Sequence, residues 1–560
     1  MEQEVSILIG GPAGSGVFLT SLITAKVLKN HGYRVFTTNE YPSLIRGGHQ
    51  WGLVRASRSE IYSHRKGVDI LLALDEATIN LHIRELNEYG VVVCDENIKN
   101  SLKTDSRVLS APFLQLVENA GAPRISLNMA ELGYALGILE ADLQTLIEVI
   151  KEHFKGAYAS VNARVAQLSY KLASHASSRL PVKIKRLPVR PGVLLDGNRA
   201  VALGALAGNM TFFSAYPMTP ASPILHFLAE IQEEVGVVVV QPECEIAAIN
   251  MAIGAAYAGA RALVATSGGG FSLMVEALGQ AGMAEVPVVI VNVQRPGPST
   301  GLPTHTAQGD LRFTIHASQG EFPRVVLSPG DPLEAFTLTC EALNIAWRYQ
   351  VPVILLSDKF LGESYWTVDE LPKVQPVEGS VIRENFQGGY ARYRVTEDGV
   401  SPMAIPGTKG VIVCVNANEH DEYGFVTTDP DTVKVMQEKR LRKIALLYRE
   451  AEQKGVKVYG EGEVALTVWG SVKSVALEAL KNLEGVKVVQ VVWLEPFPKE
   501  AFKIAVKGSK LLVAENNATG QLVSLIREHL LVEPDAVLLK YNGRQFYPEE
   551  IEDFVRSEVG

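Results

Sequence analysis

The stretch ALVATSGGGFSLM, residues 262–274, decides the fold of the central part of the chain. A short apolar run leads directly into three glycines and then into a sequence with helical periodicity, which is typical of a buried parallel strand running into a helix. The same alternation recurs from Gly197 to about Asp358 and predicts an α/β domain with a doubly wound parallel sheet. The strands are expected at residues 212–216, 237–240, 262–266, 288–293, 324–327 and 351–356.

The flanking regions repeat this alternation less regularly. The first 175 residues contain an apolar run at Val5–Ile9, the glycine loop GGPAGSG and a helical pattern from Val17 to His31. The stretch SRLPVKIKRLPVRPG, residues 178–192, holds three prolines, so it predicts a linker rather than a helix. We therefore expect α/β domains over 1–177, 197–375 and 460–560, a linker over 178–196, and an irregular connector with a charged helix (Val433–Lys454) over 376–459.

The composition is that of an ordinary globular protein, with 47% hydrophobic and 21% charged residues. The formal net charge of −9 argues against a nucleic-acid-binding protein, which needs a concentrated basic face. No apolar run approaches the roughly 18 residues that span a bilayer. The N-terminal MEQEV carries acidic residues where a secretory signal carries basic ones. We expect a cytoplasmic protein that contacts neither nucleic acid nor membrane.

The cysteines are widely separated and include no CxxC pair. An iron–sulfur cluster or a structural zinc ion needs closely spaced ligands, so we expect no metal site on this chain. Cys94 and Cys414 lie in apolar runs and are expected in buried strands. The motif NEHDEYG, residues 418–424, has one histidine among acids and predicts a solvated loop.

Candidate site residues follow the central strands, because ligands of open α/β sheets bind at the carboxyl ends of the strands. After the first strand, Thr219 and Pro220 predict a helix N-cap and first helical residue, which either simply cap the helix or bind an anion there. Glu245 opens a helix rich in Ala, Ile, Met and Gly that is expected to be buried nearly all round. Such an acid is a candidate for proton exchange with a ligand, and Glu243 is the alternative.

Two further loops follow strands of the same sheet. Gly268–Gly270 form either a tight turn or a surface that a ligand backbone approaches closely. Arg295 begins the loop RPGPSTGLPT, where it either makes a structural salt bridge or binds a carboxylate, with hydroxyls from Ser299, Thr300 and Thr304.

At the N-terminus, Gly10–Gly16 and the motif RGGHQW (residues 46–51) suggest a phosphate or nucleotide site. An ordinary turn and a surface loop explain them equally well.

Together, YPMTPAS, PECEIAAINMAIGAAYAG, TSGGGFSLM and QRPGPSTGLPT resemble the alpha subunits of the 2-oxoacid:ferredoxin oxidoreductases. GPAGSGV and RGGHQW resemble that family's gamma domain, fused ahead of alpha, and EHDEYG and KYNGRQFYPEEI fit the 2-oxoglutarate-type sub-group. The resemblance implies a gamma-like domain over 1–177, a thiamine diphosphate pyrimidine-binding domain over 197–375 and a transketolase C-terminal-like domain over 460–560. One departure is Gly269, where the family often has proline.

The resemblance also implies roles for individual residues. Glu245 matches the catalytic carboxylate that engages the aminopyrimidine of thiamine diphosphate. The substrate carboxylate would be bound by Thr219, Arg295 and Thr304. Further contacts to the cofactor would come from Tyr216, Pro217, Gly268 and Gly269. Coenzyme A would contact Gly14, Ser15 and Arg46.

The implied reaction is oxidative decarboxylation of 2-oxoglutarate or a pyruvate-like acid to an acyl-CoA and CO2. The chain lacks a GDG…N diphosphate motif and clustered cysteines. The resemblance therefore assigns Mg²⁺, diphosphate binding and the iron–sulfur cluster to a beta subunit, which passes electrons to ferredoxin in an α2β2 heterotetramer.

Three rival interpretations stay open on the sequence. The first two are an indolepyruvate-type oxidoreductase subunit and a 2-oxoacid dehydrogenase component. The third is a non-catalytic nucleotide-binding regulator made of two α/β domains, which would explain the glycine loops but not Glu245 together with Arg295.

Overall fold

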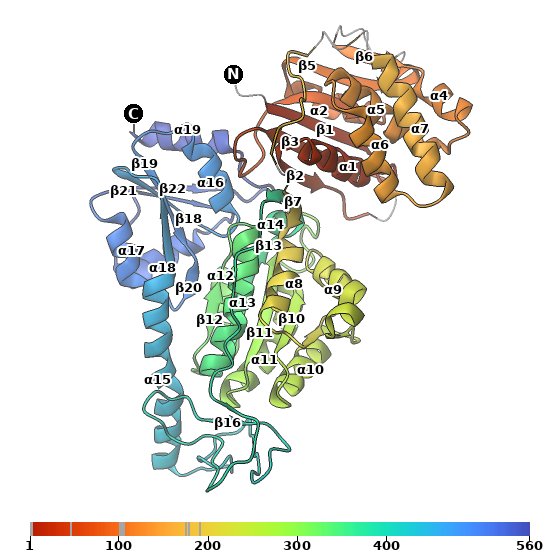
Figure 1. The fold of residues 1–560 in the computed structure, drawn as a ribbon. Helices are drawn as coiled ribbons and strands as arrows, with labels where there is room; N and C mark the ends of the chain where they lie inside the picture. Colours follow the sequence, from red (N-terminus) through yellow and green to blue (C-terminus); the bar gives the residue numbers. More distant parts are fainter. Residues whose placement is uncertain are drawn as a thin grey trace. The chain divides into compact units, whose positions relative to one another are not determined.

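The computed structural model describes residues 4–44, 47–99, 107–173, 176, 180–189 and 192–559, and the chain divides into two compact units (Figure 1). Unit 1 consists of residues 1–195 with the short segments 363–370 and 547–549. Unit 2 consists of residues 196–362, 371–546 and 550–560.

Unit 1 is built on one mixed sheet with the strand order β6-β5-β4-β1-β3-β2-β14-β7. β1 pairs in parallel with β4, and β4, β5 and β6 continue in parallel, whereas β3, β2 and β14 are antiparallel to their neighbours. The strands are β1 (Glu4–Pro12), β2 (Arg34–Glu40), β3 (His49–Ser57), β4 (Val68–Ala73), β5 (Leu86–Asp95), β6 (Val108–Ala111), β7 (Val193–Asp196) and β14 (Tyr365–Val368).

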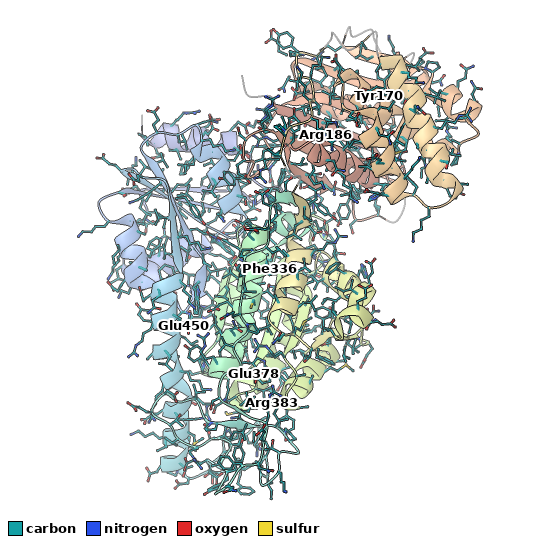
Figure 2. All side chains as sticks on the ribbon, viewed as in Figure 1. Tyr170, Arg186, Phe336, Glu378, Arg383 and Glu450 are labelled. Carbon is teal, nitrogen blue, oxygen red and sulfur yellow. The ribbon has the colours of Figure 1, made fainter. Side chains whose placement is uncertain are left out.

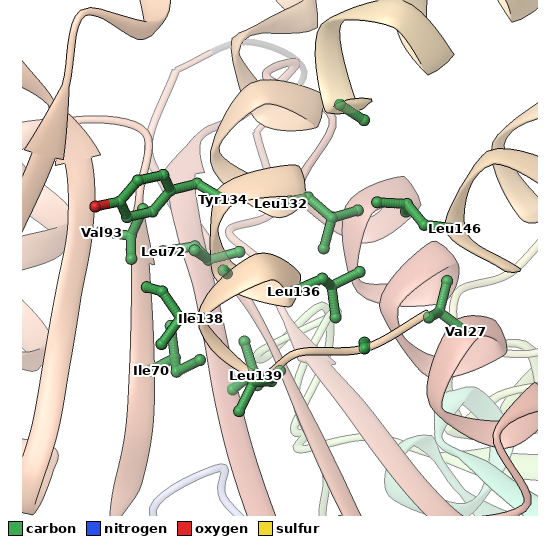
Figure 3. Close-up of a cluster of buried hydrophobic side chains, with 14 of the residues drawn as sticks. Val27, Ile70, Leu72, Val93, Leu132, Tyr134, Leu136, Ile138, Leu139 and Leu146 are labelled. Carbon is green, nitrogen blue, oxygen red and sulfur yellow. The ribbon is translucent and has the colours of Figure 1, made fainter. Parts of the chain in front are cut away.

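The helices of unit 1 divide between long ones and short ones. The long ones supply most of the core, where Ile138 on α5 lies beside Ile70 on β4, and Leu132 and Leu136 point toward Val27 and Leu146 on two other long helices (Figure 3). The long helices are α1 (Val17–Asn30), α5 (Leu127–Ile138), α6 (Leu143–His153) and α7 (Ala157–Leu172). The short ones are α2 (Glu76–His82), η1 (Ile83–Glu85), α3 (Glu96–Lys99), α4 (Phe113–Asn119) and η2 (Arg124–Ser126).

The central sheet of unit 2 has the order β20-β12-β13-β11-β10-β8-β9. All strands are parallel except β20, which joins β12 in the antiparallel sense. The chain moves from β8 to β9 on one side and then returns to β10 on the other, so the strand order reverses between β8 and β10. The crevice at such a reversal is the usual ligand site of this architecture.

The strands and helices of this region match the expected alternation. The strands are β8 (Phe212–Ser214), β9 (Val238–Val240), β10 (Ala262–Thr266), β11 (Val288–Gln294), β12 (Val325–Leu327), β13 (Pro352–Asp358) and β20 (Trp493–Glu495). The helices are α8 (Gly197–Ala207), α9 (Ser222–Val235), α10 (Glu245–Tyr257), α11 (Gly268–Met283), α12 (Leu311–Ile315), α13 (Pro332–Tyr349) and α14 (Lys359–Glu363). α8 and α13 pack so closely that a Cβ on Gly204 would lie 2.1 Å from the carbonyl oxygen of Phe336, a residue labelled in Figure 2.

The C-terminal part of unit 2 forms a second sheet with the order β17-β19-β18-β21-β22, in which only β17 is antiparallel to its neighbour. Its strands are β17 (Val456–Tyr459), β18 (Val464–Trp469), β19 (Val486–Val491), β21 (Lys510–Glu515) and β22 (Ala536–Leu539). Its helices are α16 (Val472–Leu480), α17 (Lys499–Val506), α18 (Gln521–Leu530) and α19 (Pro548–Val559). The fold class expected from the sequence, several α/β domains with parallel-rich sheets, is confirmed.

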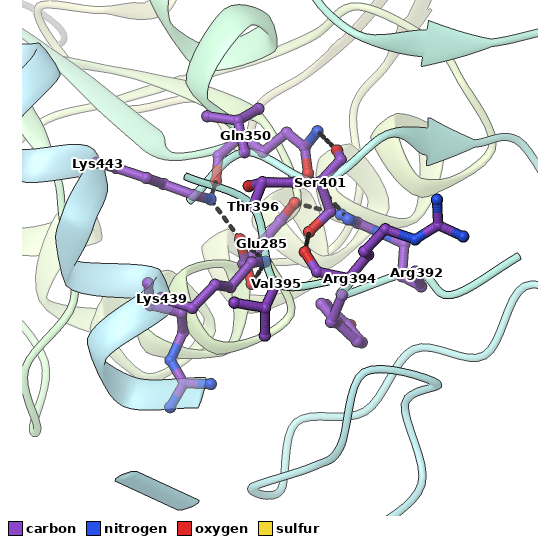
Figure 4. A network of polar contacts seen from close by, with 12 residues as sticks. Glu285, Gln350, Arg392, Arg394, Val395, Thr396, Ser401, Lys439 and Lys443 are labelled. Atoms are coloured by element: carbon purple, nitrogen blue, oxygen red, sulfur yellow. Dashed lines mark hydrogen bonds and ion pairs between the residues drawn. The ribbon is translucent and has the colours of Figure 1, made fainter. Parts of the chain in front are cut away.

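The connector between the two sheets is irregular, with only β15 (Val381–Ile382), β16 (Met403–Ala404) and the long helix α15 (Pro430–Lys454). A buried cluster of charges fixes it (Figure 4). Glu285, which follows α11, accepts hydrogen bonds from Lys439 at 2.7 and 2.9 Å and from Lys443, both on α15. Arg392 donates to the Glu285 carbonyl at 2.7 Å and to the Gln350 side chain at 2.9 Å.

The structure differs from several sequence predictions. The charged helix begins at Pro430, with Asp429 as N-cap, rather than at Val433. Cys94 lies in β5 as expected, but Cys414 lies in a loop, where its thiol faces the Gly424 carbonyl at 3.4 Å. The NEHDEYG motif is only partly solvated, because Asn418 and Tyr423 are exposed whereas His420 is fully buried, with its ring centroid 3.9 Å from that of Tyr393.

The domain ranges remain predictions, although the two units differ from them in several places. The residues of the expected linker that the structure describes pack into unit 1, where Ile184 donates to the Leu139 carbonyl and Leu187 to the His31 carbonyl. Residues 365–368 form β14 in the sheet of unit 1, although the sequence placed them in the central domain. In the described part of the chain, no helix is long and apolar enough to cross a membrane.

Candidate functional site

The candidate site lies at the carboxyl edge of the central sheet, where loops from three strands meet. The loop after β11 is joined to the loop after β8, because the Arg295 guanidinium donates a hydrogen bond of 2.7 Å to the Thr219 carbonyl. The glycine turn after β10 lies on the strand between them. The sequence therefore brings together residues that are 76 positions apart along the chain.

Glu245 is the first residue of α10, with Cys244 at the N-cap, and only 4% of its surface is exposed. Among the residues that the structure describes, its carboxyl group has no hydrogen-bond or ion-pair partner. Glu243, its rival in the sequence, is exposed. A buried carboxyl group without a partner is costly and is usually a sign of a missing ligand, so Glu245 is the stronger candidate.

The prediction that α10 is buried nearly all round is wrong. Its outer side carries exposed Ile246 (51%) and Met251 (42%), next to exposed Leu273 (50%) on α11. α10 and α11 pack against each other, so these side chains belong to neighbouring helices. The two helices therefore expose aliphatic side chains that the rest of the described chain does not cover.

The glycine turn is explained by space rather than by unusual backbone angles. A Cβ on Gly270 would lie 2.1 Å from the Thr266 hydroxyl and 2.7 Å from Glu245 Oε1. A Cβ on Gly268 would lie 2.5 Å from Asp310 Oδ2. Nothing lies within 4 Å of a Cβ on Gly269, and this position is in the first turn of α11. The family often has proline at the position of Gly269. Of the three glycines, this one has open space around its Cβ position, so the departure falls where a side chain would fit.

Arg295 lines an open cavity of about 530 Å³. Its other lining residues are Met218, Gly268, Gly269, Ser272, Gly297, Pro298, Ser299, Thr300, Asp310 and Phe313. Burial lowers the pKa of the Arg295 guanidinium, while Asp310 acts in the opposite direction. Asp310 was missed in the sequence, where the motif QGDL looks like an ordinary loop end. Its only signal was an acid directly before an apolar helical pattern.

Thr219 and Pro220 do not start a helix. α9 begins at Ser222, with Ala221 at the N-cap and Pro223 in the first turn. The preceding residues form a turn in which Ala221 donates to the Met218 carbonyl at 2.7 Å, and Asn198 on α8 donates to the Pro220 carbonyl at 3.0 Å. The sequence rule mistook this turn for the helix start because proline is compatible with both positions.

The other expected contacts lie around the cavity rather than in it. Tyr216 is partly exposed and Pro217 partly buried, and neither is among the lining residues, although Met218 is. Thr304 is buried, with its hydroxyl 3.1 Å from His305 Nδ1, and it does not line the cavity either. The structure of this chain thus joins Arg295, Thr219, Gly268 and Gly269, while Thr304 stands apart.

In unit 1, the Gly10–Gly16 loop connects β1 to α1. Gly14 has φ +91° and open space around it, and Ser15 uses its hydroxyl to bond the Pro12 carbonyl at 2.7 Å. Arg46 lies outside the described residues. His49 is hydrogen-bonded to His82 (Nε2 to Nε2, 2.8 Å). Burial and His82 lower its pKa, which makes it a poor anion ligand.

No group of three or more His, Cys, Asp or Glu side chains that could hold a metal ion occurs among the residues described. The charged groups available to a ligand of the central cavity are Arg295 and Asp310.

Comparison with known proteins gives consistent matches along the whole chain. Residues 203–439 match the family model described as "Pyruvate flavodoxin/ferredoxin oxidoreductase, thiamine diP-bdg". Residues 6–172 match the one described as "Pyruvate ferredoxin/flavodoxin oxidoreductase".

Individual relatives agree with these models. A 2-oxoacid:ferredoxin oxidoreductase subunit alpha of Saccharolobus solfataricus is 33% identical, over 100% of this chain and 98% of the relative. The 2-oxoglutarate oxidoreductase subunit KorA of Mycobacterium tuberculosis is 31% identical, over 100% and 92%. Among solved structures, the 2-oxoglutarate:ferredoxin oxidoreductase from Magnetococcus marinus "with 2-oxoglutarate, coenzyme A and succinyl-CoA bound" matches with a TM-score of 0.92 and 31% identity, over 100% of both chains.

Proposed function

Because the chain belongs to the alpha subunits of the 2-oxoacid:ferredoxin oxidoreductases, we propose that it oxidises 2-oxoglutarate at a site where Glu245 and Arg295 act together. The protein is a subunit of a thiamine diphosphate-dependent oxidoreductase that decarboxylates 2-oxoacids. The roles of individual residues and the choice of substrate are proposals.

The observation that carries the proposal is the buried, unpartnered carboxyl group of Glu245. A ring nitrogen of the aminopyrimidine is a suitable partner, because it can share a proton with a carboxyl group that is positioned beside it. Thiamine diphosphate, when bound, supplies the carbon nucleophile and the electron sink that decarboxylation of a 2-oxoacid requires. Glu245 holds or releases the proton, and Gly270 leaves the space beside it.

Arg295 is the group that binds the substrate carboxylate in this proposal. Its guanidinium uses one donor on the Thr219 carbonyl and faces a cavity with the hydroxyls of Ser299 and Thr300. A guanidinium presents paired N–H donors that match a carboxylate, and partial burial strengthens the contact. Thr304 contributes only if its loop moves, since its hydroxyl faces His305 in this structure.

A second subunit completes the site. The exposed aliphatic side chains Ile246, Met251 and Leu273 are the surface that we assign to it, because they lie on the helices that begin with Glu245 and with the glycine turn, and because this chain carries no diphosphate motif or clustered cysteines. We propose that this beta subunit holds Mg²⁺ with the diphosphate and an iron–sulfur cluster, transfers electrons to ferredoxin, and forms an α2β2 heterotetramer. The cytoplasmic location stays a prediction of the sequence.

Coenzyme A is proposed as the acyl acceptor. Unit 1 offers two places for it: the glycine loop with Gly14 and Ser15, and an open cavity of about 590 Å³. The cavity is lined by Leu8, Trp51, Leu53, Arg65, Lys66, Gly67, Val68, Arg84, Glu85, Leu86, Asn87 and Tyr547. Cations and aromatic rings in one cavity suit the phosphates and adenine of a nucleotide.

The test is an activity assay on the complex purified with its partner chain. Reduction of a viologen dye is measured with 2-oxoglutarate, pyruvate and a branched 2-oxoacid, with and without coenzyme A. We expect kcat/KM to be at least tenfold higher for 2-oxoglutarate than for pyruvate, with succinyl-CoA as the product. A preference for pyruvate contradicts the substrate assignment. Absence of turnover with every 2-oxoacid in the thiamine diphosphate-loaded complex contradicts the function.

A further inference from the structure

Asp310 is an acidic residue in the cavity that the proposed chemistry does not yet use. It lies directly before α12, and its backbone N–H donates to the Gln294 side chain at 2.9 Å. Its Oδ2 accepts a hydrogen bond of 3.1 Å from Asn292 Nδ2. Asn292 and Gln294 are fully buried neighbours on β11, so buried amides hold this carboxyl group in one place.

The same carboxylate oxygen also rests against the glycine turn. Oδ2 would lie 2.5 Å from a Cβ on Gly268, so only glycine fits there. The two carboxyl groups of this region thus contact opposite ends of the same turn, with Glu245 at Gly270 and Asp310 at Gly268. Asp310 is therefore held in a defined position in the site, unlike an acid on the protein surface.

The cavity is lined by one positively and one negatively charged side chain. Arg295 and Asp310 are the only charged side chains among the lining residues. The sole hydrogen-bond acceptor of the Arg295 side chain in the described part of the chain is the neutral Thr219 carbonyl. Arg312, the next cation along the chain, already pairs with Glu528 at 2.6 Å. Burial raises the pKa of Asp310, while Asn292 and Arg295 act against that rise.

We propose that Asp310 is a positioning residue that serves as the counter-ion of Arg295 until the carboxylate of a 2-oxoacid replaces it in that role. An ionised Asp310 and a bound substrate carboxylate repel each other, because both face the same guanidinium. Binding of substrate therefore favours the protonated form of Asp310, which takes up a proton from solvent. This inference rests on the proposed function of Arg295.

The cycle closes when the substrate carboxylate leaves as CO2. The electron pair of the broken carbon–carbon bond stays on the remaining fragment, so the negative charge beside Arg295 disappears. Asp310 then returns its proton and again faces Arg295 as its anion. Arg295 therefore has a negatively charged partner at every stage. A permanent salt bridge is avoided, because it would compete with the substrate carboxylate for the guanidinium.

The test uses the complex with its partner chain and the variant Asp310→Asn. KM and kcat for 2-oxoglutarate and pyruvate are measured between pH 6 and 9. In the wild type, Asp310 is neutral below its pKa and opposes the substrate above it, so KM should rise with pH. In Asp310→Asn, KM should be at least threefold lower at the alkaline end and independent of pH, with a smaller change in kcat.

Calorimetry of pyruvate binding, in two buffers with different ionisation enthalpies, provides a readout that needs no turnover. The wild type should take up a fraction of a proton on binding and Asp310→Asn none. Asn292→Leu serves if Asp310→Asn does not fold. It removes the hydrogen bond that stabilises the ionised carboxylate, so the rise of KM should move to higher pH. Glu276→Gln, an exposed acid on α11, is the control for net charge and should leave the KM profile unchanged.

The outcomes separate this inference from the proposed function. An unchanged KM profile and proton uptake in Asp310→Asn would overturn it, and so would a tenfold rise of KM, which would mean that Asp310 only holds Arg295 in place. If Arg295→Ala raises KM while Asp310→Asn changes nothing, only the counter-ion role fails. If Arg295→Ala also leaves KM unchanged, the carboxylate site itself is wrong.

Discussion

Two glutamates of unit 2 have nearly the same burial and opposite surroundings. Glu245 begins α10 after β9 and has no partner among the described residues, whereas Glu285 follows α11 and is bound by Lys439 and Lys443. Glu285 is 1% exposed and Glu245 4%. Burial alone therefore does not distinguish a functional acid from a structural one.

The difference lies in how each charge is compensated. Around Glu285, two ammonium groups and a carbonyl-bound guanidinium more than balance the carboxylate, and their attraction holds its pKa far below its usual range against the effect of burial. Glu245 instead adjoins the space that Gly270 leaves because it has no side chain. A fully paired charge stabilises a fold, while an unpaired one leaves free energy for a ligand to recover.

The largest effect is expected from Glu245→Gln. The 2-oxoacid-dependent reduction of dye by the complex should fall by about 10²–10⁴-fold, the usual range for loss of a positioned proton-transfer group. The urea midpoint of the chain should stay the same or rise, because a buried carboxyl group without a partner is removed. Glu243→Gln is the matched control and should keep near-normal activity. Equal losses of activity in Glu245→Gln and Glu243→Gln would contradict a specific role for Glu245.

Glu285→Gln should show the reverse pattern. It leaves the buried ammonium groups of Lys439 and Lys443 without a carboxylate, which costs about 3–5 kcal/mol in the free energy of unfolding. Activity per folded molecule should be retained. Urea denaturation measures the change, and Glu438→Gln, an exposed acid on α15 4.0 Å from Lys434, should change it by less than about 0.5 kcal/mol. A loss of less than about 1 kcal/mol in Glu285→Gln would contradict a stabilising role.

The glycine turn provides a matched pair of alanine variants. Gly270→Ala places a methyl group 2.1 Å from the Thr266 hydroxyl and 2.7 Å from Glu245 Oε1, so it should displace the carboxyl group and lower kcat by about tenfold or more. Gly269→Ala meets no protein atom within 4 Å and should lower kcat less than Gly270→Ala does, while stabilising the first helical turn by up to ~1 kcal/mol. The comparison fails if Gly269→Ala is the more damaging variant.

The smallest effect concerns pH. Burial lowers the pKa of Lys439 to about 8 despite Glu285, so between pH 8 and 10.5 the unfolded chain binds more protons at this residue than the folded chain. Stability should therefore rise with pH across this window, by on the order of 1 kcal/mol. Unfolding of the wild type and of Lys439→Met, compared at pH 8 and 10, measures this contribution. Parallel pH profiles for the two proteins would exclude it.

Much of the fold was visible in the sequence. The central strands fall within two residues of their expected places, and α1 occupies Val17–Asn30 as expected. Continuous apolar runs and glycine turns are local signals that directly reflect backbone geometry and burial. The start of α9 was wrong because Thr219-Pro220 and Ser222-Pro223 give the same local signal for different turns.

The site was only partly visible. Glu245, Arg295 and the glycine turn were identified because an acid, a guanidinium and three glycines stand at the ends of apolar strands. Asp310 was missed, since its importance depends on Arg295, 15 residues earlier, and on Gly268, 42 residues earlier. The exposed side of α10 was missed because the periodicity of an apolar helix does not tell which of its faces the rest of the chain leaves uncovered.

The sequence by itself determined the element types, the alternation of strands and helices, and the chemical groups at the strand ends, because each depends on residues that are neighbours in the chain. The tertiary structure decided which buried acid is paired and which is free, that residues 365–368 join the sheet of unit 1, and that Asp310 and Arg295 line one cavity. These outcomes depend on distances between segments far apart in sequence, which the packing of whole elements sets and no local pattern records.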